Sequence, residues 1–379
     1  MVYRPLGNTG INVSALGFGC MRLPMTKEND KEIVNDELAT PLLKRAVELG
    51  INFFDSHWFY CNYDSQRAVG KALKDIRSKV YLSTKIPMWL VEKPEDFDDY
   101  LAKALDQMGL EYLDFYHLPY LNYRTWKDKI LPLKLLDRAE KAKAKGLIRH
   151  LSFSFHGDAD KMPELIDTGA FSTVMGQYNI VDRTSEELFA YAKDKGVGTI
   201  VMVPLMGGVL TDGGKTFMER MEYDKLDHVP STAAEMALRF TWSLPAVDMV
   251  LSGMTTLTQL EENVAYSLNA DNIPQKERQA LISRSNEVNT INDLFCTTCN
   301  YCHECPLEIK IDQIFQLYNQ HNVWGLTDAV RTRRKQEPPF GLTADPASCT
   351  GCGVCVKRCP QNIDIPAELK RVWPVLMGL

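Results

Sequence analysis

The sequence lacks the features that bring a protein to nucleic acid or to a membrane. Its 43 Lys and Arg residues are outnumbered by 49 Asp and Glu residues, so the formal net charge is -6. This balance offers no basic surface to a polyphosphate or an anionic bilayer. No apolar run approaches the ~20 residues of a membrane-spanning helix, and the first residues lack the basic start and apolar stretch of a signal peptide. We therefore expect a cytoplasmic protein that binds neither nucleic acid nor membrane.

Cysteine is scarce in the first three-quarters of the chain, where only Cys20 and Cys61 occur. The other eight of the ten cysteines lie in two short runs after residue 295. A disulfide framework spreads cysteines through a small secreted domain, whereas clustered thiols in a long chain indicate metal binding in a reducing compartment. The C-terminal region is therefore predicted to hold metal.

The larger part of the chain alternates short apolar runs with longer amphipathic segments, from about residue 10 to residue 270. Eight runs, such as INFFDS, VYLSTK and TIVMVPL, are too short for helices and favour buried parallel strands. Eight strands with helices between them over roughly 260 residues are typical of a TIM barrel. An open doubly wound sheet would need G-x-G-x-x-G after its first strand, and GFGCMRLP lacks it. We predict an α/β fold with a (β/α)8 TIM barrel over residues 1–290 and a small, mainly helical domain over residues 291–379.

Polar residues close several of the predicted strands. Asp55 ends the second strand and Tyr60 follows it, Lys85 ends the third, and His117 lies on the fourth. Chemistry in such barrels occurs at the face where the strands end. These four side chains are therefore expected to meet at one mouth of the barrel.

At these residues the sequence resembles the aldo-keto reductases. GINFFDSHWFY, VYLSTK and LDFYH are similar to the family's catalytic motifs, and VSALGFG, GLIRHLSFS, GQYN, VPLMGG and QLEEN match its order and spacing over roughly residues 3–268. The resemblance implies Asp55, Tyr60, Lys85 and His117 as a catalytic tetrad that reduces a carbonyl compound or oxidises an alcohol. A phenol is a weak acid, so we expect Lys85 to lower the pKa of Tyr60 and Asp55 to orient Lys85. His117 would then hydrogen-bond the substrate oxygen.

The resemblance also implies a nicotinamide cofactor across the barrel mouth. Its expected contacts are Ser154, Gln177, Pro204, Leu205, Gly253, Gln259 and Asn263. Relatives that prefer NADP carry Lys or Arg in the loop after the last strand, where this chain reads LSGMTTLTQLEEN without a base. Because a phosphate without a cationic partner is costly to bind, we expect NAD(H) to be favoured over NADP(H).

The two cysteine runs predict iron–sulfur clusters. The first run is Cys296, Cys299, Cys302 and Cys305, and the second is Cys349, Cys352, Cys355 and Cys359. The second has the C-x2-C-x2-C-x3-C-P spacing of bacterial two-cluster ferredoxins, whereas structural zinc prefers C-x2-C pairs separated by a long loop. Eight thiolates satisfy two [4Fe-4S] clusters with four each.

The partition of these thiolates follows a ferredoxin rule in which the fourth cysteine of a run ligates the other cluster. One cluster would then take Cys359 with the first three cysteines of the first run, and the other would take Cys305 with Cys349, Cys352 and Cys355. The first run is one residue shorter before its last cysteine, which leaves the partition open. The insert between the runs resembles helical ferredoxin modules of respiratory dehydrogenases, and a barrel fused to such a module resembles one branch of the aldo-keto reductases.

Two functions are compatible with these features. The first is an oxidoreductase that acts on a small carbonyl or alcohol substrate, with clusters that exchange electrons with a carrier protein such as ferredoxin. Hydride transfer moves two electrons and a cluster moves one, and the sequence shows no motif for the flavin that usually mediates between them. The second is a non-catalytic redox sensor or electron-transfer subunit on a barrel scaffold. The intact tetrad favours the enzyme.

Overall fold

The computed structural model describes residues 1–29, 31–155, 162–289, 294, 296, 302, 305–335, 344–359 and 363–379. Its internal contacts form two compact units, one of Met1–Gly207 with Ala237–Gln275 and one of Gly208–Met236 with Lys276–Leu379. The segment 208–236 groups with the C-terminal residues because α9 (Val209–Arg220) contacts α14 (Thr327–Lys335). This division differs from the predicted boundary at residue 290, which stays a prediction about domains.

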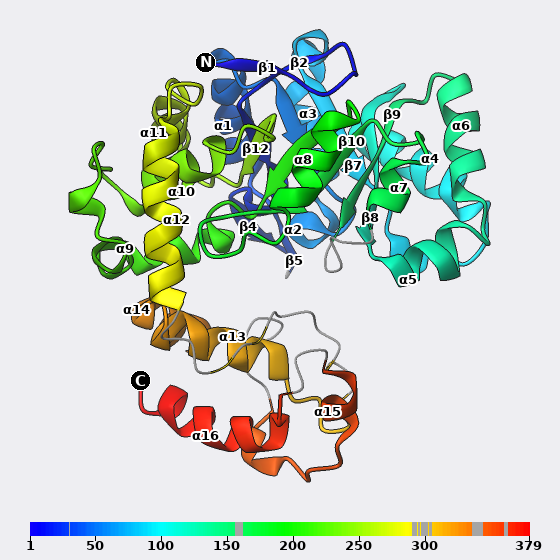
Figure 1. The fold of residues 1–379 in the computed structure, drawn as a ribbon. Helices are drawn as coiled ribbons and strands as arrows, with labels where there is room; N and C mark the ends of the chain where they lie inside the picture. Colours follow the sequence, from blue (N-terminus) through cyan, green and yellow to red (C-terminus); the bar gives the residue numbers. More distant parts are fainter. Residues whose placement is uncertain are drawn as a thin grey trace. The chain divides into compact units, whose positions relative to one another are not determined.

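The first unit contains a closed barrel of eight parallel strands, as the alternating pattern predicted (Figure 1). The strands are β3 (Leu16–Gly19), β6 (Phe53–Asp55), β7 (Tyr81–Lys85), β8 (Leu113–Leu121), β9 (Ile148–Phe155), β10 (Thr173–Gln177), β11 (Gly198–Met202) and β12 (Met249–Ser252). The ring runs from β3 through β12 in chain order and closes where β12 pairs with β3. All eight apolar runs of the sequence have become barrel strands.

Helices follow the strands and lie outside the ring (Figure 1). They are α1 (Asp36–Glu48), α3 (Ser65–Leu73), α4 (Asp96–Met108), α6 (Leu135–Ala144), α7 (Pro163–Ile166), α8 (Glu186–Asp194), α10 (Ala233–Trp242) and α11 (Leu257–Ser267). Helix α4 illustrates how an amphipathic segment becomes an outer helix, because it buries Phe97, Leu101, Ala104 and Leu105 on one face. It ends at Gly109, whose φ of 63° suits a glycine terminator.

A hairpin closes the end of the barrel where the strands begin. It consists of β1 (Tyr3–Pro5) and β2 (Asn12–Ser14), and its Leu6 packs with Phe53, Phe115 and Ile200 inside the barrel. Gly7 in its turn has a φ of 49°, and a Cβ there would lie 2.3 Å from the backbone nitrogen of Gly198. Only glycine allows this approach, so the hairpin and the filled interior leave the opposite end for chemistry. A second hairpin, β4 (Met25–Glu28) and β5 (Lys31–Val34), follows the first barrel strand.

The second unit is helical, as predicted. Besides α9 and α14 it contains α12 (Gln275–Asn289), α13 (Ile311–Asn322), α15 (Val354–Arg358) and α16 (Ile365–Met377). Helices α13 and α16 lie side by side (Figure 1). Their apolar residues recur at helical spacing and form a core of Ile311, Ile314, Phe315, Ile365, Leu369, Val372 and Leu376. Several cysteines of both runs pack against this core.

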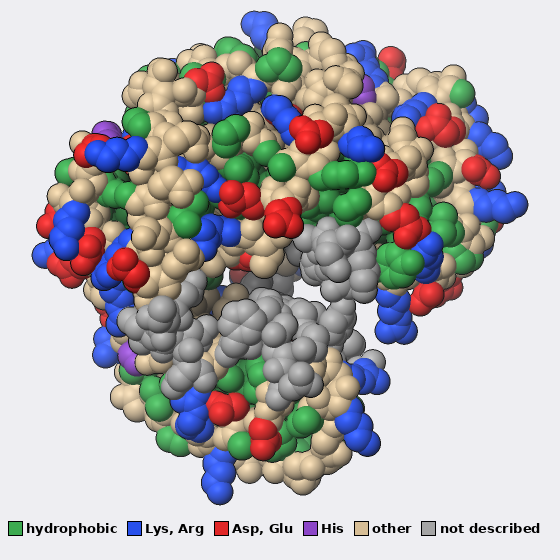
Figure 2. Space-filling model, in the orientation of Figure 1, with side chains coloured by type: hydrophobic (Ala, Val, Ile, Leu, Met, Phe, Trp, Pro, Cys, Tyr) green, Lys and Arg blue, Asp and Glu red, His purple; other side chains and the backbone are tan. Residues whose placement is uncertain are grey.

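The surface and the helices agree with the charge and hydropathy of the sequence. On the face seen in Figure 2, Lys and Arg side chains are interspersed with Asp and Glu side chains rather than gathered by sign. Among the residues that the structure describes, no helix has the length and apolar character needed to cross a membrane.

Candidate active site

The register of the barrel brings the predicted tetrad to one rim. Asp55 is the last residue of β6 and pairs with Ser83 of β7, while Lys85, the last residue of β7, pairs with His117 of β8. Tyr60 lies five residues after Asp55, at the start of the short helix α2 (Tyr60–Tyr63). Three adjacent parallel strands and the loop after the first of them therefore supply all four side chains.

Lys85 is the centre of this constellation. Its ammonium group forms a buried ion pair with Asp55, donates to the carbonyl oxygen of Ser56 at 3.3 Å, and lies 3.5 Å from the Tyr60 hydroxyl. The Ser83 hydroxyl donates to the other Asp55 oxygen at 2.9 Å. Burial raises the pKa of the Asp55 carboxyl, and the Lys85 ammonium opposes this rise. The network fixes Lys85 beside the phenol, as the sequence predicted.

The acidity of Tyr60 differs from the expectation. Burial first, and then the Asp55 carboxylate, raise the pKa of Tyr60 well above its ordinary value. The predicted lowering by Lys85 is wrong for the site as it stands, because Asp55 balances the ammonium charge and the phenol is removed from water. Tyr60 therefore stays protonated at ordinary pH, which is the form that a proton donor needs.

His117 is fully buried, and neither of its ring nitrogens has a hydrogen-bond partner among the described residues. Burial first, and then the Lys85 charge, lower the pKa of His117 well below its usual value, while the Phe153 backbone acts in the opposite direction. The ring is therefore neutral and retains one N–H donor. A buried polar group without a partner costs roughly 1–3 kcal/mol, so the unused donor of His117, on the strand next to Lys85, suits a ligand oxygen.

The rim also concentrates unusual backbone conformations. Cys61, Asn62 and Tyr63, directly after the tetrad tyrosine, all have positive φ, and so do Tyr120 after His117 and Val203 after β11. Non-glycine residues in this region cost roughly 1–3 kcal/mol each and cluster at functional sites. Four of these strained residues follow strands β6 and β11, and Tyr120 is the last residue but one of β8, so they support the assignment of this rim as the site.

The expected nicotinamide contacts lie at the same rim, and several of their side chains form hydrogen bonds within the protein. Ser154 and Gln177 stand at the ends of β9 and β10, and Gln177 donates to Asp182 at 2.8 Å. Gln259 belongs to the capping box of α11, where its side-chain oxygen accepts from the backbone of Thr255 at 2.8 Å. These side chains already have structural partners.

The other expected contacts also follow strand ends. The buried Asn263 donates to the Ser252 hydroxyl at 3.1 Å and so ties α11 to β12. Pro204 and Leu205 follow β11, and Gly253 follows β12.

Arg22 is a rim residue that the sequence reading missed. It lies in the 3-10 turn after β3, and its backbone carbonyl accepts from the Thr255 hydroxyl at 2.8 Å. A Cβ on Gly253 would lie 3.6 Å from the Arg22 stem, and one on Gly207 would lie 3.0 Å from its Nη2 atom. Among the described residues its guanidinium has no hydrogen-bond or ion-pair partner. In the sequence this residue is the arginine of GCMRLP. Its position near Gly253 depends on β3 lying next to β12.

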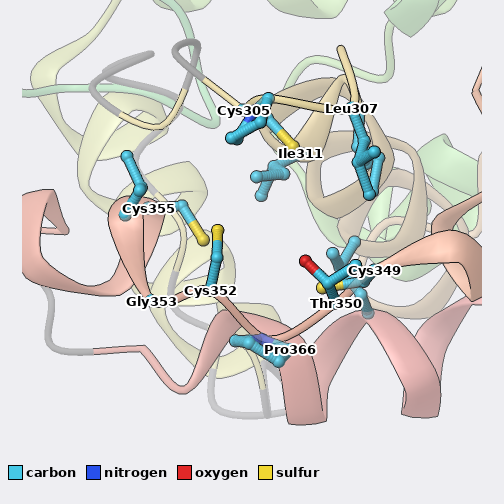
Figure 3. A pocket seen from close by; sticks show the side chains of 13 residues that line it. Cys305, Leu307, Ile311, Cys349, Thr350, Cys352, Gly353, Cys355 and Pro366 are labelled. Atoms are coloured by element: carbon cyan, nitrogen blue, oxygen red, sulfur yellow. The ribbon is translucent and has the colours of Figure 1, made fainter.

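A second candidate site lies in the helical unit. Cys305, Cys349, Cys352 and Cys355 line one pocket together with Ile311 and Pro366 (Figure 3). Gly351 and Gly353, between these cysteines, have φ of 67° and 76°, which lets the chain curl around the pocket. Burial raises the pKa of Cys355, and the charges of Cys349 and Cys305 add to this rise. Four thiols gathered around one hollow can ligate a metal centre once they lose their protons to it.

This pocket contains the four cysteines that the ferredoxin rule assigns to one cluster. The described residues contain no group of three or more His, Cys, Asp or Glu side chains arranged for a single metal ion. A four-iron cluster is larger than one ion and takes one thiolate per iron, so four thiols around a hollow fit it. Of the other predicted ligands, Cys296, Cys302 and Cys359 are half-buried against the helical core, and Cys299 lies outside the described residues.

Comparison with known proteins gives matches to two families. Residues 15–281 match the aldo/keto reductase family, and residues 295–363 match the 4Fe-4S dicluster domain. L-galactose dehydrogenase of Arabidopsis thaliana is 29% identical over 69% of this chain and 86% of its own. NADH-specific methylglyoxal reductase of Escherichia coli is 25% identical over 69% and 92%. An aldo-keto reductase of Bacillus halodurans in its holo form superposes with a TM-score of 0.63 at 25% identity, covering 75% of this chain and 96% of that one.

Proposed function

Because the chain belongs to the aldo/keto reductase family and carries a C-terminal 4Fe-4S dicluster domain, we propose that it reduces aldehydes or ketones with NAD(P)H, or oxidises the corresponding alcohols. The observation that carries this proposal is the buried Lys85, which is paired with Asp55 and lies 3.5 Å from the Tyr60 hydroxyl. A redox sensor would have no use for this arrangement. The proposed compartment is the cytoplasm.

Four side chains divide the work in this proposal. The nicotinamide supplies the hydride. Tyr60 gives its proton to the reacting oxygen, and Lys85 stabilises the phenolate that remains. Asp55 holds Lys85 in place, and the neutral His117 donates a hydrogen bond to the same oxygen. The raised pKa of Tyr60 keeps the proton in place until the oxygen becomes basic during the reaction.

The cofactor end of the site supports NADH as the preferred cofactor. The loop after β12 carries no base of its own, and one relative is an NADH-specific methylglyoxal reductase. The nearby cation is Arg22, which lies next to Gly253. We propose that its guanidinium binds the diphosphate that both dinucleotides share. Ser154 and Gln177 would hold the carboxamide, and the backbone around Pro204, Leu205 and Gly253 would lie along the cofactor.

The clusters are proposed to exchange electrons with a soluble carrier protein such as ferredoxin. Cys305, Cys349, Cys352 and Cys355 would hold one cluster, and Cys296, Cys299, Cys302 and Cys359 the other. A flavin would reconcile two-electron and one-electron transfer, but no feature of the chain supports one. Anaerobic titration with NADH and with reduced ferredoxin, followed by cluster absorbance, tests whether the two redox centres communicate.

The experiment that tests the catalytic proposal is Tyr60→Phe. This variant keeps the ring and removes the proton donor, so kcat for carbonyl reduction should fall by about 100-fold or more, while NADH binding measured by fluorescence is retained. Tyr63→Phe is the matched control, because Tyr63 lies three residues away and is exposed. A Tyr60→Phe enzyme with near-normal kcat would refute the role.

A further inference from the structure

A ring cluster beside Tyr60 contains a hydrogen-bond donor that the catalytic proposal does not use. The imidazole of His57 is 1% exposed and lies among the rings of Phe59, Tyr60, Trp89 and Tyr120, at centroid distances of 4.3, 5.1, 5.6 and 6.4 Å. Trp89 stacks on it with an interplanar angle of 13°. These rings come from the loops and strand ends of β6, β7 and β8, which are the strands that carry the tetrad.

The hydrogen bonds of His57 define its chemistry. Its Nδ1 atom accepts from the backbone N–H of Phe59 at 3.2 Å, so the proton of the neutral ring is on Nε2. Burial, followed by the charges of Lys85 and His117, lowers the pKa of His57 to about 2, so the ring is neutral at ordinary pH. The buried Nε2 atom has no hydrogen-bond partner among the described residues. His57 therefore presents one N–H donor that cannot switch to an acceptor.

Two of the surrounding rings open the cluster to solvent. Trp89 is 46% exposed and Tyr120 is 41% exposed, whereas the adjacent His57 is buried. Tyr120 holds its position with a φ of 57°, a strained conformation for a residue other than glycine. A small molecule that reaches Tyr60 from solvent would thus contact aromatic side chains and lie next to the His57 ring, whose centroid is 5.1 Å from that of Tyr60.

We propose that His57 donates a hydrogen bond to a second oxygen of the substrate, so that the preferred substrates are carbonyl compounds with a hydroxyl or oxo group one or two carbons from the reacting carbonyl. The proposal deepens the carbonyl reductase assignment and rests on it. Tyr60 and His117 engage the reacting oxygen, and His57 engages its neighbour. A simple aldehyde leaves the buried His57 donor without an acceptor, and a site built around such a donor discriminates against the compound that lacks the oxygen.

The test compares lactaldehyde with propionaldehyde, which lacks the second oxygen. The wild-type ratio of kcat/KM should favour lactaldehyde by about 10- to 100-fold. His57→Phe keeps a flat ring and removes the donor, so the ratio should fall to near one. His57→Gln restores an N–H donor and should recover part of the preference. His150→Phe is the matched control, because His150 lies near the start of β9, away from the rim, and should keep the wild-type ratio.

A binding measurement separates this inference from the proposed activity. Propylene glycol and propanol are titrated into the full-length holoenzyme saturated with NAD, and His57→Phe should abolish the preference for the glycol. If neither aldehyde is reduced, the assigned activity fails, while the glycol preference still decides the role of His57. A wild-type ratio near one, or a ratio that survives in His57→Phe, overturns the inference. A His57→Phe effect confined to NADH affinity does so as well, because it assigns the donor to the cofactor.

Discussion

The barrel rim and the cysteine pocket achieve the same end, a set of polar groups held around a ligand, by different means. At the rim, residues far apart in the sequence meet because parallel strands end together, and Asp55 already satisfies Lys85. In the helical unit, three of the four pocket cysteines lie within seven residues, and Cys305, Cys349 and Cys355 pack on the helical core. The polar groups of the rim satisfy one another, whereas the thiols of the pocket are proposed to be satisfied by an iron–sulfur cluster.

The largest expected effect breaks the cysteine pocket. Cys355→Ser should lower the iron content of anaerobically purified protein from about eight to about four per chain. Because Cys355 lies in the helical core, hydrogen exchange should quicken in α13 and α16 and remain slow in the barrel strands. Iron analysis and exchange mass spectrometry measure both, and Cys20→Ser serves as control. Unchanged iron in Cys355→Ser would remove this thiol from the ligand set.

The next largest effect tests whether the Lys85–Asp55 ion pair stabilises the rim. Lys85→Met leaves the Asp55 carboxylate buried without its partner, which should cost about 3–5 kcal/mol in the free energy of unfolding and abolish turnover. A second change, Asp55→Leu, should restore much of the stability but none of the activity.

The pH dependence of the stability that Lys85→Met loses has a defined sign. Removing Lys85 raises the pKa of Asp55 further, so the loss of stability is full at high pH and shrinks as acid protonates the carboxyl. A loss that grows in acid would contradict the pairing.

A smaller effect concerns the cofactor. Arg22→Ala should raise the dissociation constants of NADH and NADPH by a similar factor of about 10, because both carry the diphosphate. Arg45→Ala, on the exposed face of α1, is the matched control. Fluorescence titration measures both. A penalty confined to NADPH would assign Arg22 to the 2′-phosphate and oppose the preference for NADH.

The smallest expected effect is a flat pH profile. His57 and His117 are neutral because burial lowers their pKa values, to about 2 for His57. Tyr60 is protonated because burial raises its pKa. The kcat/KM for reduction should therefore show no inflection between about pH 5 and 8, where a histidine normally titrates, and should fall only in strong alkali as Tyr60 loses its proton. An inflection near the ordinary histidine pKa would show that one of these rings titrates during catalysis.

Sequence alone predicted what depends on periodicity and spacing. Buried parallel strands have a strong pattern, so the barrel, the positions of Asp55 and Lys85 at strand ends and that of His117 on the next strand followed from it. The direction of the Tyr60 pKa did not, because it depends on how completely tertiary packing removes the phenol from water. The neighbourhood of Arg22 was also not predicted, because it depends on the conformation of the 3-10 turn after β3 as well as on the pairing of the first and last strands. The helix-cap role of Gln259 was not predicted either, because it depends on the local conformation at the start of α11, and its cofactor role stays a prediction.

The N-terminal hairpin covers the end of the barrel where the strands begin, so reactants can approach only from the opposite end. Anything that reacts at Tyr60 has to arrive and depart through the same opening, past Trp89 and Tyr120. When cofactor and substrate share one entrance, the molecule that binds deeper enters first and leaves last. The restriction to one entrance depends on Gly7, because its turn lets the hairpin approach Gly198 at the end of the barrel opposite the tetrad.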